Sequence, residues 1–182
     1  MRRTSRIGAS FKGSFLDSHP ARPYDPPPMR ALIIFLASAG YVGYIPIASG
    51  TFGTLVAIPL FFGFDALRTA SVPLYLLAFI ASVGAACWIS GKADEYLHEH
   101  DSHKIVIDEV VGYLAATLFL SPTWTHVLLA FFIFRALDVI KPFPAGYIDE
   151  NVPGGYGVTL DDVVSGLYTN LAIRLLIAVV GV

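Results

Sequence analysis

Six apolar runs, separated by segments rich in polar residues, glycine and proline, constrain the fold of this chain more than any other feature. They cover residues 31–45, 52–66, 73–91, 105–121, 124–140 and 163–182. A membrane-spanning helix needs roughly 20 apolar residues, with about 17 as the lower limit, so only two runs are comfortably long. With 55% hydrophobic and 14% charged residues, the chain is too apolar for an ordinary soluble domain. The pattern predicts an all-α, polytopic membrane helical bundle with four or five membrane helices, plus a re-entrant or interfacial segment at about residues 31–51.

The charged residues divide the chain into two parts. Six of the twelve Lys and Arg residues precede residue 31, whereas eleven of the fourteen acidic residues lie from Asp94 onward. Residues 1–30 have the composition of an irregular, disordered tail, and residues 31–182 form the predicted membrane-embedded domain. A basic arm before the first apolar run favours a cytoplasmic N-terminus.

This orientation places the polar segments on one side of the membrane. If residues 31–51 do not cross, the run 52–66 leads outward and the run 73–91 returns. The loops 92–104 and 141–160 then both face the cytoplasm, together with the start of the run at 105. We therefore expect the chemistry of the chain to be gathered at the cytoplasmic surface.

Two pairs of adjacent acidic residues, at 108–109 and 161–162, stand at the edges of apolar runs. The simplest interpretation is that they are favourable charges in the first turn of a helix, with Thr159 as a possible cap for the second pair. Each pair is also followed by a glycine one helical turn later, Gly112 after the first and Gly166 after the second. Small residues at this spacing predict that another helix packs closely against each acidic pair.

A third polar cluster lies near the end of the run 124–140. Arg135, Asp138 and Lys141 follow one another at intervals of three, so each neighbouring pair shares a helix face. An intrahelical ion pair at the membrane surface would account for them, but three acidic clusters on one surface point to a hard cation. Mg²⁺ prefers oxygen ligands and is commonly held by one or two carboxylates and a substrate phosphate.

Other residues of the same surface fit an anionic substrate better than a second metal. The GGYG segment at 154–157 could present backbone N–H groups to an anion. A simple turn is the more common interpretation of such a segment. Lys104, with Arg135 and Lys141, supplies positive charge for phosphate oxygens. A zinc site is disfavoured because His98, His100 and His103 crowd one loop without a cysteine.

Four segments together resemble the phosphatidylglycerophosphatase A family, and the resemblance covers about residues 31–182. They are IPIASGTFGTLVAIP (45–59), HDSHKIVIDEVVGY (100–113), FRALDVIKPFP (134–144) and NVPGGYGVTLDDVVSG (151–166). The resemblance implies a bacterial inner-membrane enzyme that uses Mg²⁺ to hydrolyse phosphatidylglycerophosphate to phosphatidylglycerol. The expected partners are this anionic lipid and the bilayer, and no nucleic acid.

The resemblance and the residue types together assign roles to the polar residues. Metal binding is expected at Glu109, Asp138 and Asp162, with Asp108 and Asp161 as further ligands or as residues that orient the ligands. Arg135 and Lys141 are expected to hold the phosphate and offset transition-state charge, with His103, Lys104 and Thr51 also contacting substrate. Asp101 or His103 is a candidate proton shuttle, and Asp108 competes as general base.

The sequence also bears on mechanism and on rival functions. Cys87 has Ala93 rather than an arginine six positions later, and no Asp-x-Asp motif occurs, so hydrolysis by metal-activated water without a covalent intermediate is expected. A cation transporter would need acidic residues through the depth of the membrane. A non-catalytic protein that binds anionic lipids would explain the basic residues but not so many carboxylates.

Overall fold

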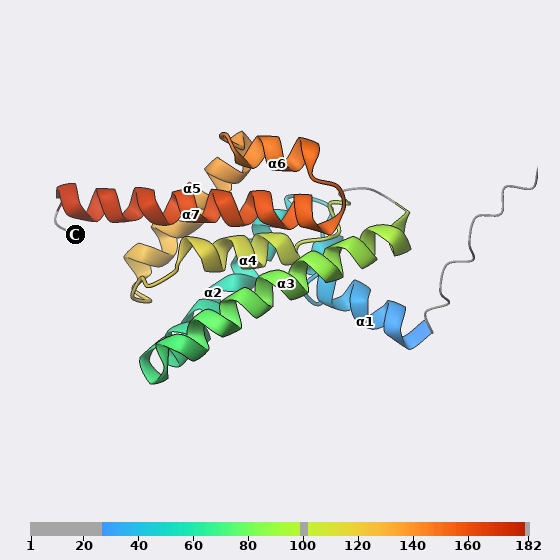
Figure 1. Ribbon diagram of the computed structural model, residues 1–182, viewed down its shortest axis with the longest axis horizontal. Coiled ribbons are helices and arrows are strands. Elements are labelled where there is room, and N and C mark those ends of the chain that lie inside the picture. The colour runs from blue at the N-terminus through green and yellow to red at the C-terminus, as the bar shows by residue number, and fades with distance from the viewer. Residues whose placement is uncertain (1–26, 99–101, 181–182) are drawn as a thin grey trace, which may run out of the picture.

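A computed structural model of the protein describes residues 27–98 and 102–180, and all regular secondary structure in these ranges is helical (Figure 1). This confirms the predicted all-α class. The elements are α1 (Pro27–Ala37), the short 3₁₀ helix η1 (Val42–Tyr44), α2 (Ser49–Ala70), α3 (Val72–Leu97), α4 (Ile107–Ala116), α5 (Trp124–Ile140), α6 (Ala145–Asn151) and α7 (Gly155–Val180). The predicted tail, residues 1–30, lies almost wholly outside the described residues, and only its last four residues are seen, at the start of α1.

Three helices, α2, α3 and α7, are long and apolar enough to cross a membrane, judged by length and composition over the described residues. α2 is longer than the apolar run 52–66 because the helix also takes in the polar residues at both ends, giving it 22 residues. α5 has 17 residues, close to the lower limit for a span. The predicted number of four or five membrane helices stays a prediction.

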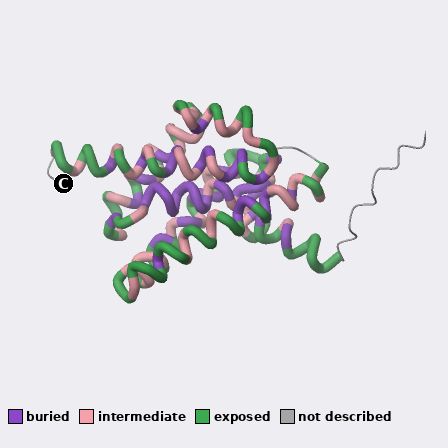
Figure 2. Tube along the Cα trace, in the orientation of Figure 1, coloured by how far each residue is buried: buried purple, intermediate pink, exposed green. Residues whose placement is uncertain are grey.

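α4 is the central helix of the bundle although it is one of the shortest. It lies between α7 on one side and the α2–α3 pair on the other (Figure 1), and eight of its ten residues are buried. Figure 2 shows the same concentration of buried residues along α4 and the facing side of α7. The apolar run 105–121 has 17 residues, the lower limit for one of the predicted membrane helices, but its helix ends at Ala116. Ten residues rise only about 15 Å, too short to span.

The C-terminal end of α4 lies inside the bundle, and side chains of other helices satisfy its backbone groups. The amide of Asn170 on α7 donates to the carbonyl oxygens of Ala116 and Leu118, both at 2.9 Å. Arg174 also donates to Leu118 at 2.9 Å, and the Phe119 N–H donates to the hydroxyl of Tyr75 at 3.2 Å. An unsatisfied backbone group in an apolar environment costs several kcal/mol, so these contacts allow a helix to end there.

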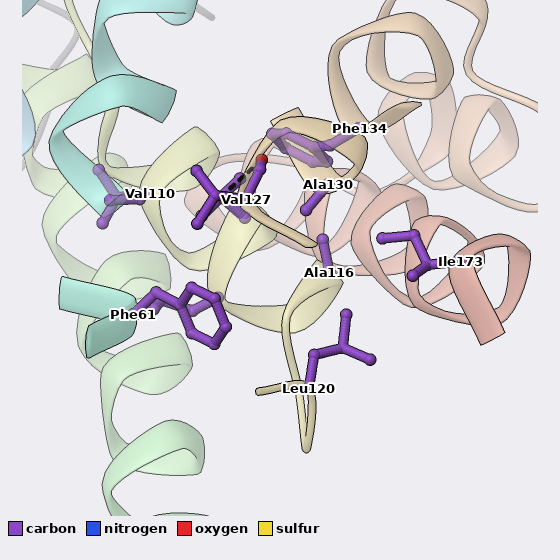
Figure 3. Packing of buried hydrophobic residues seen from close by; sticks show 11 residues of the cluster. Phe61, Val110, Ala116, Leu120, Val127, Ala130, Phe134 and Ile173 are labelled. Atoms are coloured by element: carbon purple, nitrogen blue, oxygen red, sulfur yellow. Dashed lines mark hydrogen bonds between the residues drawn. The ribbon is translucent and has the colours of Figure 1, made fainter. Parts of the chain in front are cut away.

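The main hydrophobic core surrounds α4 and joins it to three neighbouring helices (Figure 3). Tyr113 is fully buried within it and donates its hydroxyl hydrogen to the carbonyl oxygen of Val127 at 3.1 Å. Buried side chains from α2, α4, α5 and α7 meet there, among them Phe61, Val110, Ala116, Val127, Ala130, Phe134 and Ile173. A second, smaller cluster joins α1 to α3 and to the segment before α4; its members are Ile33, Ala37, Ile89, Ala93 and Ile105.

Glycines bring the helices around α4 into backbone contact. A Cβ atom at Gly166 would collide with the carbonyl oxygen of Gly112, and one at Gly112 would lie 2.6 Å from the Phe134 ring. Both glycines predicted to mark close helix packing therefore do so. At Gly155 a Cβ would collide with the Cys87 carbonyl oxygen, so α7 and α3 also touch through their backbones.

The start of α7 differs from the sequence-based expectation. The GGYG segment at 154–157 is not a loop before the helix, because α7 begins at Gly155. Thr159 consequently lies within the helix, fully buried, and is not its cap. The acidic pair 161–162 lies in the second turn of α7 rather than at its end. The first residue of the helix is a glycine at a close contact with α3, where a side chain would collide with the α3 backbone.

Replacing Gly166 by alanine should lower the melting temperature of the detergent-solubilised protein, because the new methyl group has no room against the α4 backbone. Overpacking of this kind costs roughly 1–3 kcal/mol. Gly84→Ala is the matched control, since a Cβ there meets no atom within 4 Å. It should leave the melting temperature unchanged or raise it. Equal melting temperatures for the two variants would contradict the close packing of α4 and α7.

Candidate active site

Three carboxylates from two helices meet where the N-terminus of α4 faces the second turn of α7. One side-chain oxygen each of Asp108, Glu109 and Asp162 lies within 4.8 Å of the other two. Asp108 and Asp162 are 6% and 4% exposed, so two of the three groups are withdrawn from water. We call Asp108, Glu109 and Asp162 the carboxylate trio.

The trio lacks enough positive charge to neutralise it. Burial, followed by the charge of Glu109, raises the pKa of Asp108 well above its usual range. Burial likewise raises the pKa of Glu109 to about 7. One oxygen of Glu109, Oε2, is buried and has no hydrogen-bond partner. Buried carboxylates in this arrangement are stable either with protons or with a cation, and oxygen ligands suit a hard divalent ion.

Arg135 and Asp138, at the end of α5, border the trio. Arg135 Nη1 lies 2.7 Å from Asp138 Oδ2 and 3.9 Å from Glu109 Oε1. The predicted pairing of Arg135 with Asp138 on one helix face is therefore confirmed. Asp138 also lies within hydrogen-bonding reach of Asp162. Four carboxyl groups thus lie in one cluster with a single guanidinium group, which contacts two of them, and the site has an excess of negative charge.

Lys141 does not share a face with Asp138, contrary to the prediction from spacing. It follows the last residue of α5 in a left-handed conformation, with φ 48°, which turns it away from the helix. Its Nζ lies 2.6 Å from Asp161 Oδ2 and 2.9 Å from Asp149 Oδ2. Burial lowers the pKa of Lys141, but the two ion pairs outweigh it and raise the pKa overall, so the amine is protonated at neutral pH.

Gly50, in the first turn of α2, lies directly against the polar cluster. A Cβ at this position would collide with Glu109 Oε1 and would lie 3.0 Å from Arg135 Nη2. The backbone of α2 therefore forms one wall of the site. No spacing rule in the sequence links Gly50 to Glu109, which lies 59 positions later.

The remaining predicted site residues belong to the first turn of α2 and to the segment before α4, and one of them lies outside the described residues. His103 has an exposed side chain, and its carbonyl oxygen accepts a hydrogen bond from Ser49 Oγ at 2.7 Å. The backbone of Lys104 lies against Gly43, and Thr51 is half-buried in the first turn of α2. Asp101 lies outside the described residues, so its predicted role as a proton shuttle stays a prediction.

Comparison with known proteins identifies the family. The sequence profile of the phosphatidylglycerophosphatase A family matches residues 35–177. The chain belongs to the phosphatidylglycerophosphatase A family. The match covers the trio, Arg135, Lys141 and both partners of Lys141, and it confirms the resemblance seen in the sequence.

Three curated relatives of this family member cover most of its length. The phosphatidylglycerophosphatase A of Haemophilus influenzae is 32% identical over 142 residues, which is 77% of this chain and 86% of the relative. That of Escherichia coli is 36% identical over 127 residues, 69% of this chain and 72% of the relative. A Bacteroides thetaiotaomicron protein with a provisional name as a phosphatidylinositol-3-phosphatase is 33% identical over 148 residues, 76% of this chain and 89% of the relative. No solved structure matches the chain.

Asp149 is the residue of this family member's polar cluster that sequence analysis missed. It lies on α6, eight positions after Lys141, across a helix end and a turn. Neither helical nor strand periodicity relates two residues at that separation. The sequence shows only that Asp149 is an acidic residue between the polar segments 134–144 and 151–166, which does not link it to Lys141.

Gly50→Ala should fold normally but lose most of its phosphatase activity. The atom that the new methyl group meets first is the end of the Glu109 side chain, which can move without unfolding the protein. Its displacement would take one carboxylate out of the trio, and we expect the rate of phosphate release to fall about tenfold or more. Gly63→Ala on the same helix is the control, since no atom lies within 4 Å of that Cβ. Full activity of Gly50→Ala would contradict the placement of Glu109 against α2.

Proposed function

We propose that this member of the phosphatidylglycerophosphatase A family hydrolyses the terminal phosphomonoester of phosphatidylglycerophosphate in a Mg²⁺-dependent reaction. Family membership supports the phosphatase activity. The observation that carries the proposal is the carboxylate trio, largely buried and short of positive charge. Arg135 lies beside it, and Lys141 is paired with Asp161, the residue before Asp162.

The trio suits a magnesium ion by its donor type and spacing. We propose Asp108, Glu109 and Asp162 as the residues that hold Mg²⁺, with Asp138 next to Asp162 as a further oxygen donor. The buried, unpartnered oxygen of Glu109 supports this assignment, because a cation would satisfy it. Asp161 is less suited to the metal, since its carboxylate is already paired with Lys141. When bound, Mg²⁺ polarises a phosphoryl oxygen and lowers the pKa of a bound water.

Arg135 and Lys141 are proposed to bind the substrate phosphate. A phosphomonoester carries about two negative charges near neutral pH, which the excess of carboxylates would repel. The guanidinium group presents several N–H donors to phosphate oxygens, and the amine adds a point charge. Both groups would offset the charge that grows on the phosphoryl oxygens in the transition state.

The proposed hydrolysis forms one P–O bond from water and breaks the P–O bond to the glycerol of the lipid. The water gives up a proton to a carboxylate, and the carboxylic acid so formed gives a proton to the glycerol oxygen as its P–O bond breaks. Asp108 is our candidate for the proton acceptor because it lies within the trio, with Asp101 and His103 as the alternatives. No covalent intermediate is involved in this proposal.

The name of the Bacteroides relative favours a second candidate substrate of the same chemical class. Phosphatidylinositol 3-phosphate also carries a phosphomonoester on a lipid headgroup, and the relative is 33% identical to this chain. The chemistry proposed for the trio, Arg135 and Lys141 would serve either lipid. The two candidates differ in the size of the group that carries the phosphate.

The decisive assay measures phosphate release from phosphatidylglycerophosphate in detergent micelles, with Mg²⁺ and with EDTA. We expect release with Mg²⁺ and none with EDTA, and slower release from phosphatidylinositol 3-phosphate. Glu109→Gln and Asp162→Asn should each lose most of the activity, together with most of the rise in melting temperature that Mg²⁺ causes in the parent. Without Mg²⁺ both variants should melt no lower than the parent, because each removes a repelling charge.

If the carboxylates acted only as favourable helix charges, the results would be reversed. The variants would then keep their activity and lose about 0.3–1 kcal/mol of stability without metal. Absence of phosphate release from every lipid and with every divalent metal would contradict the enzymatic proposal itself.

We also propose that the protein lies in the bacterial inner membrane with the trio facing the cytoplasm, a proposal supported by the basic N-terminal segment. In a Cys87→Ser background, a cysteine at His98 should react with an impermeant maleimide only in inverted vesicles. A cysteine at Ser121 should react only in intact spheroplasts. Both native side chains are exposed, so labelling reports the side of the membrane. Labelling of both positions from one side would contradict this topology.

A further inference from the structure

The ion pairs of Lys141 are unusual because one amine lies between two carboxylates that belong to different helices. Asp161 comes from α7, next to Asp162 of the trio, and Asp149 comes from α6. Asp161 is almost fully buried, whereas the side chains of Lys141 and Asp149 are each 30% exposed. The amine therefore lies between a buried carboxylate and one that is partly open to solvent.

The backbone around Lys141 is held as firmly as its side chain. The Lys141 N–H donates to the Leu137 carbonyl oxygen at 2.8 Å, closing the end of α5. Gly146 of α6 packs against Lys141 from the other side, where a Cβ would lie 2.8 Å from the Lys141 carbonyl oxygen. The hydroxyl of Tyr168 on α7 donates to the Phe143 carbonyl oxygen at 3.0 Å. These contacts retain Lys141 in a left-handed conformation, which an L-residue adopts only when its surroundings enforce it.

A lysine amine carries three N–H donors, and the two carboxylates use two of them. A free lysine side chain samples many rotamers, and fixing it on a phosphate would cost entropy at each turnover. Anchoring the amine at two points removes that cost in advance and leaves one donor for a third oxygen. A single anchor at Asp161 would leave the side chain free to rotate about that contact.

We propose that Asp149 is a positioning residue that, together with Asp161, holds the Lys141 amine in place to receive a phosphate oxygen of the substrate. α6 thereby has a functional part: it carries the second anchor of Lys141 to the edge of the site. This inference rests on the proposed phosphatase function and adds to it a residue that does not itself touch the substrate.

The test compares Asp149→Asn with Glu150→Gln, which removes the same charge from the next residue of the same helix, where the side chain is exposed. With phosphatidylglycerophosphate micelles and saturating Mg²⁺, Asp149→Asn should lower kcat/KM roughly five- to twentyfold. Glu150→Gln should stay within about twofold of the parent, as expected for a surface charge. Asp149→Glu, which restores a carboxylate, should recover a large part of the loss.

A double-mutant cycle separates positioning from a merely structural role. If Asp149 acts through Lys141, adding Asp149→Asn to Lys141→Met should cause no further loss of phosphate release, measured with radiolabelled substrate. A further loss by the same factor would show that Asp149 acts independently and would overturn the inference. So would equal activities for Asp149→Asn and Glu150→Gln, failure of Asp149→Glu to recover, or a gain in activity, which would mean that Asp149 withdraws Lys141 from the substrate.

The inference and the proposed function fail in different ways. A parent protein that releases no phosphate from any lipid contradicts the function. An active parent with an unaffected Asp149→Asn variant contradicts only the role of Asp149.

Discussion

The rest of the polar site is arranged around one constraint. Three carboxyl groups, those of Asp108, Glu109 and Asp162, are largely buried and close enough to repel one another. The groups come from α4 and α7, and their oxygens approach within 4.8 Å of one another. Like charges in a medium of low dielectric constant cost free energy unless a proton or a cation offsets them. Arg135, on α5, offsets part of this negative charge. Asp161 adds little to it, because its carboxylate forms an ion pair with Lys141.

Such a meeting of carboxylates requires the helices that carry them to approach more closely than ordinary side chains allow. Gly112 and Gly166 permit it by letting α7 lie on the backbone of α4, and Gly50 lets α2 lie against Glu109. The same three positions therefore contribute to both the packing and the site. In a membrane, where apolar surface alone gives little drive for helices to associate, close backbone contact of this kind is a principal source of packing energy.

α4 shows how a short helix can occupy the centre of such a bundle. Its N-terminus carries two carboxylates of the trio, and its C-terminus ends among apolar residues, where Asn170, Arg174 and Tyr75 satisfy the free backbone groups. Because α7 supplies Asp162 at one end of this contact and Asn170 and Arg174 at the other, one helix holds α4 along its whole length. The site is thus built on the most buried pair of helices (Figure 2).

The amino-acid sequence is enough to predict the helical class, because runs of apolar residues of this length leave few alternatives to helices. It also determined local relations such as the pairing of Arg135 with Asp138 and the glycine one turn after each acidic pair, since helical spacing is a property of the chain alone. Other features of the fold depend on contacts between residues that are far apart in the sequence, and helical spacing does not predict them. The ending of α4 at Ala116 depends on side chains from α7. The start of α7 at Gly155 lies against the backbone of α3, and Lys141 contacts both Asp149 and Asp161 because α6 and α7 pack together near the end of α5. The energies of these long-range contacts depend on which helices pack against one another. The local sequence around each residue does not contain that information.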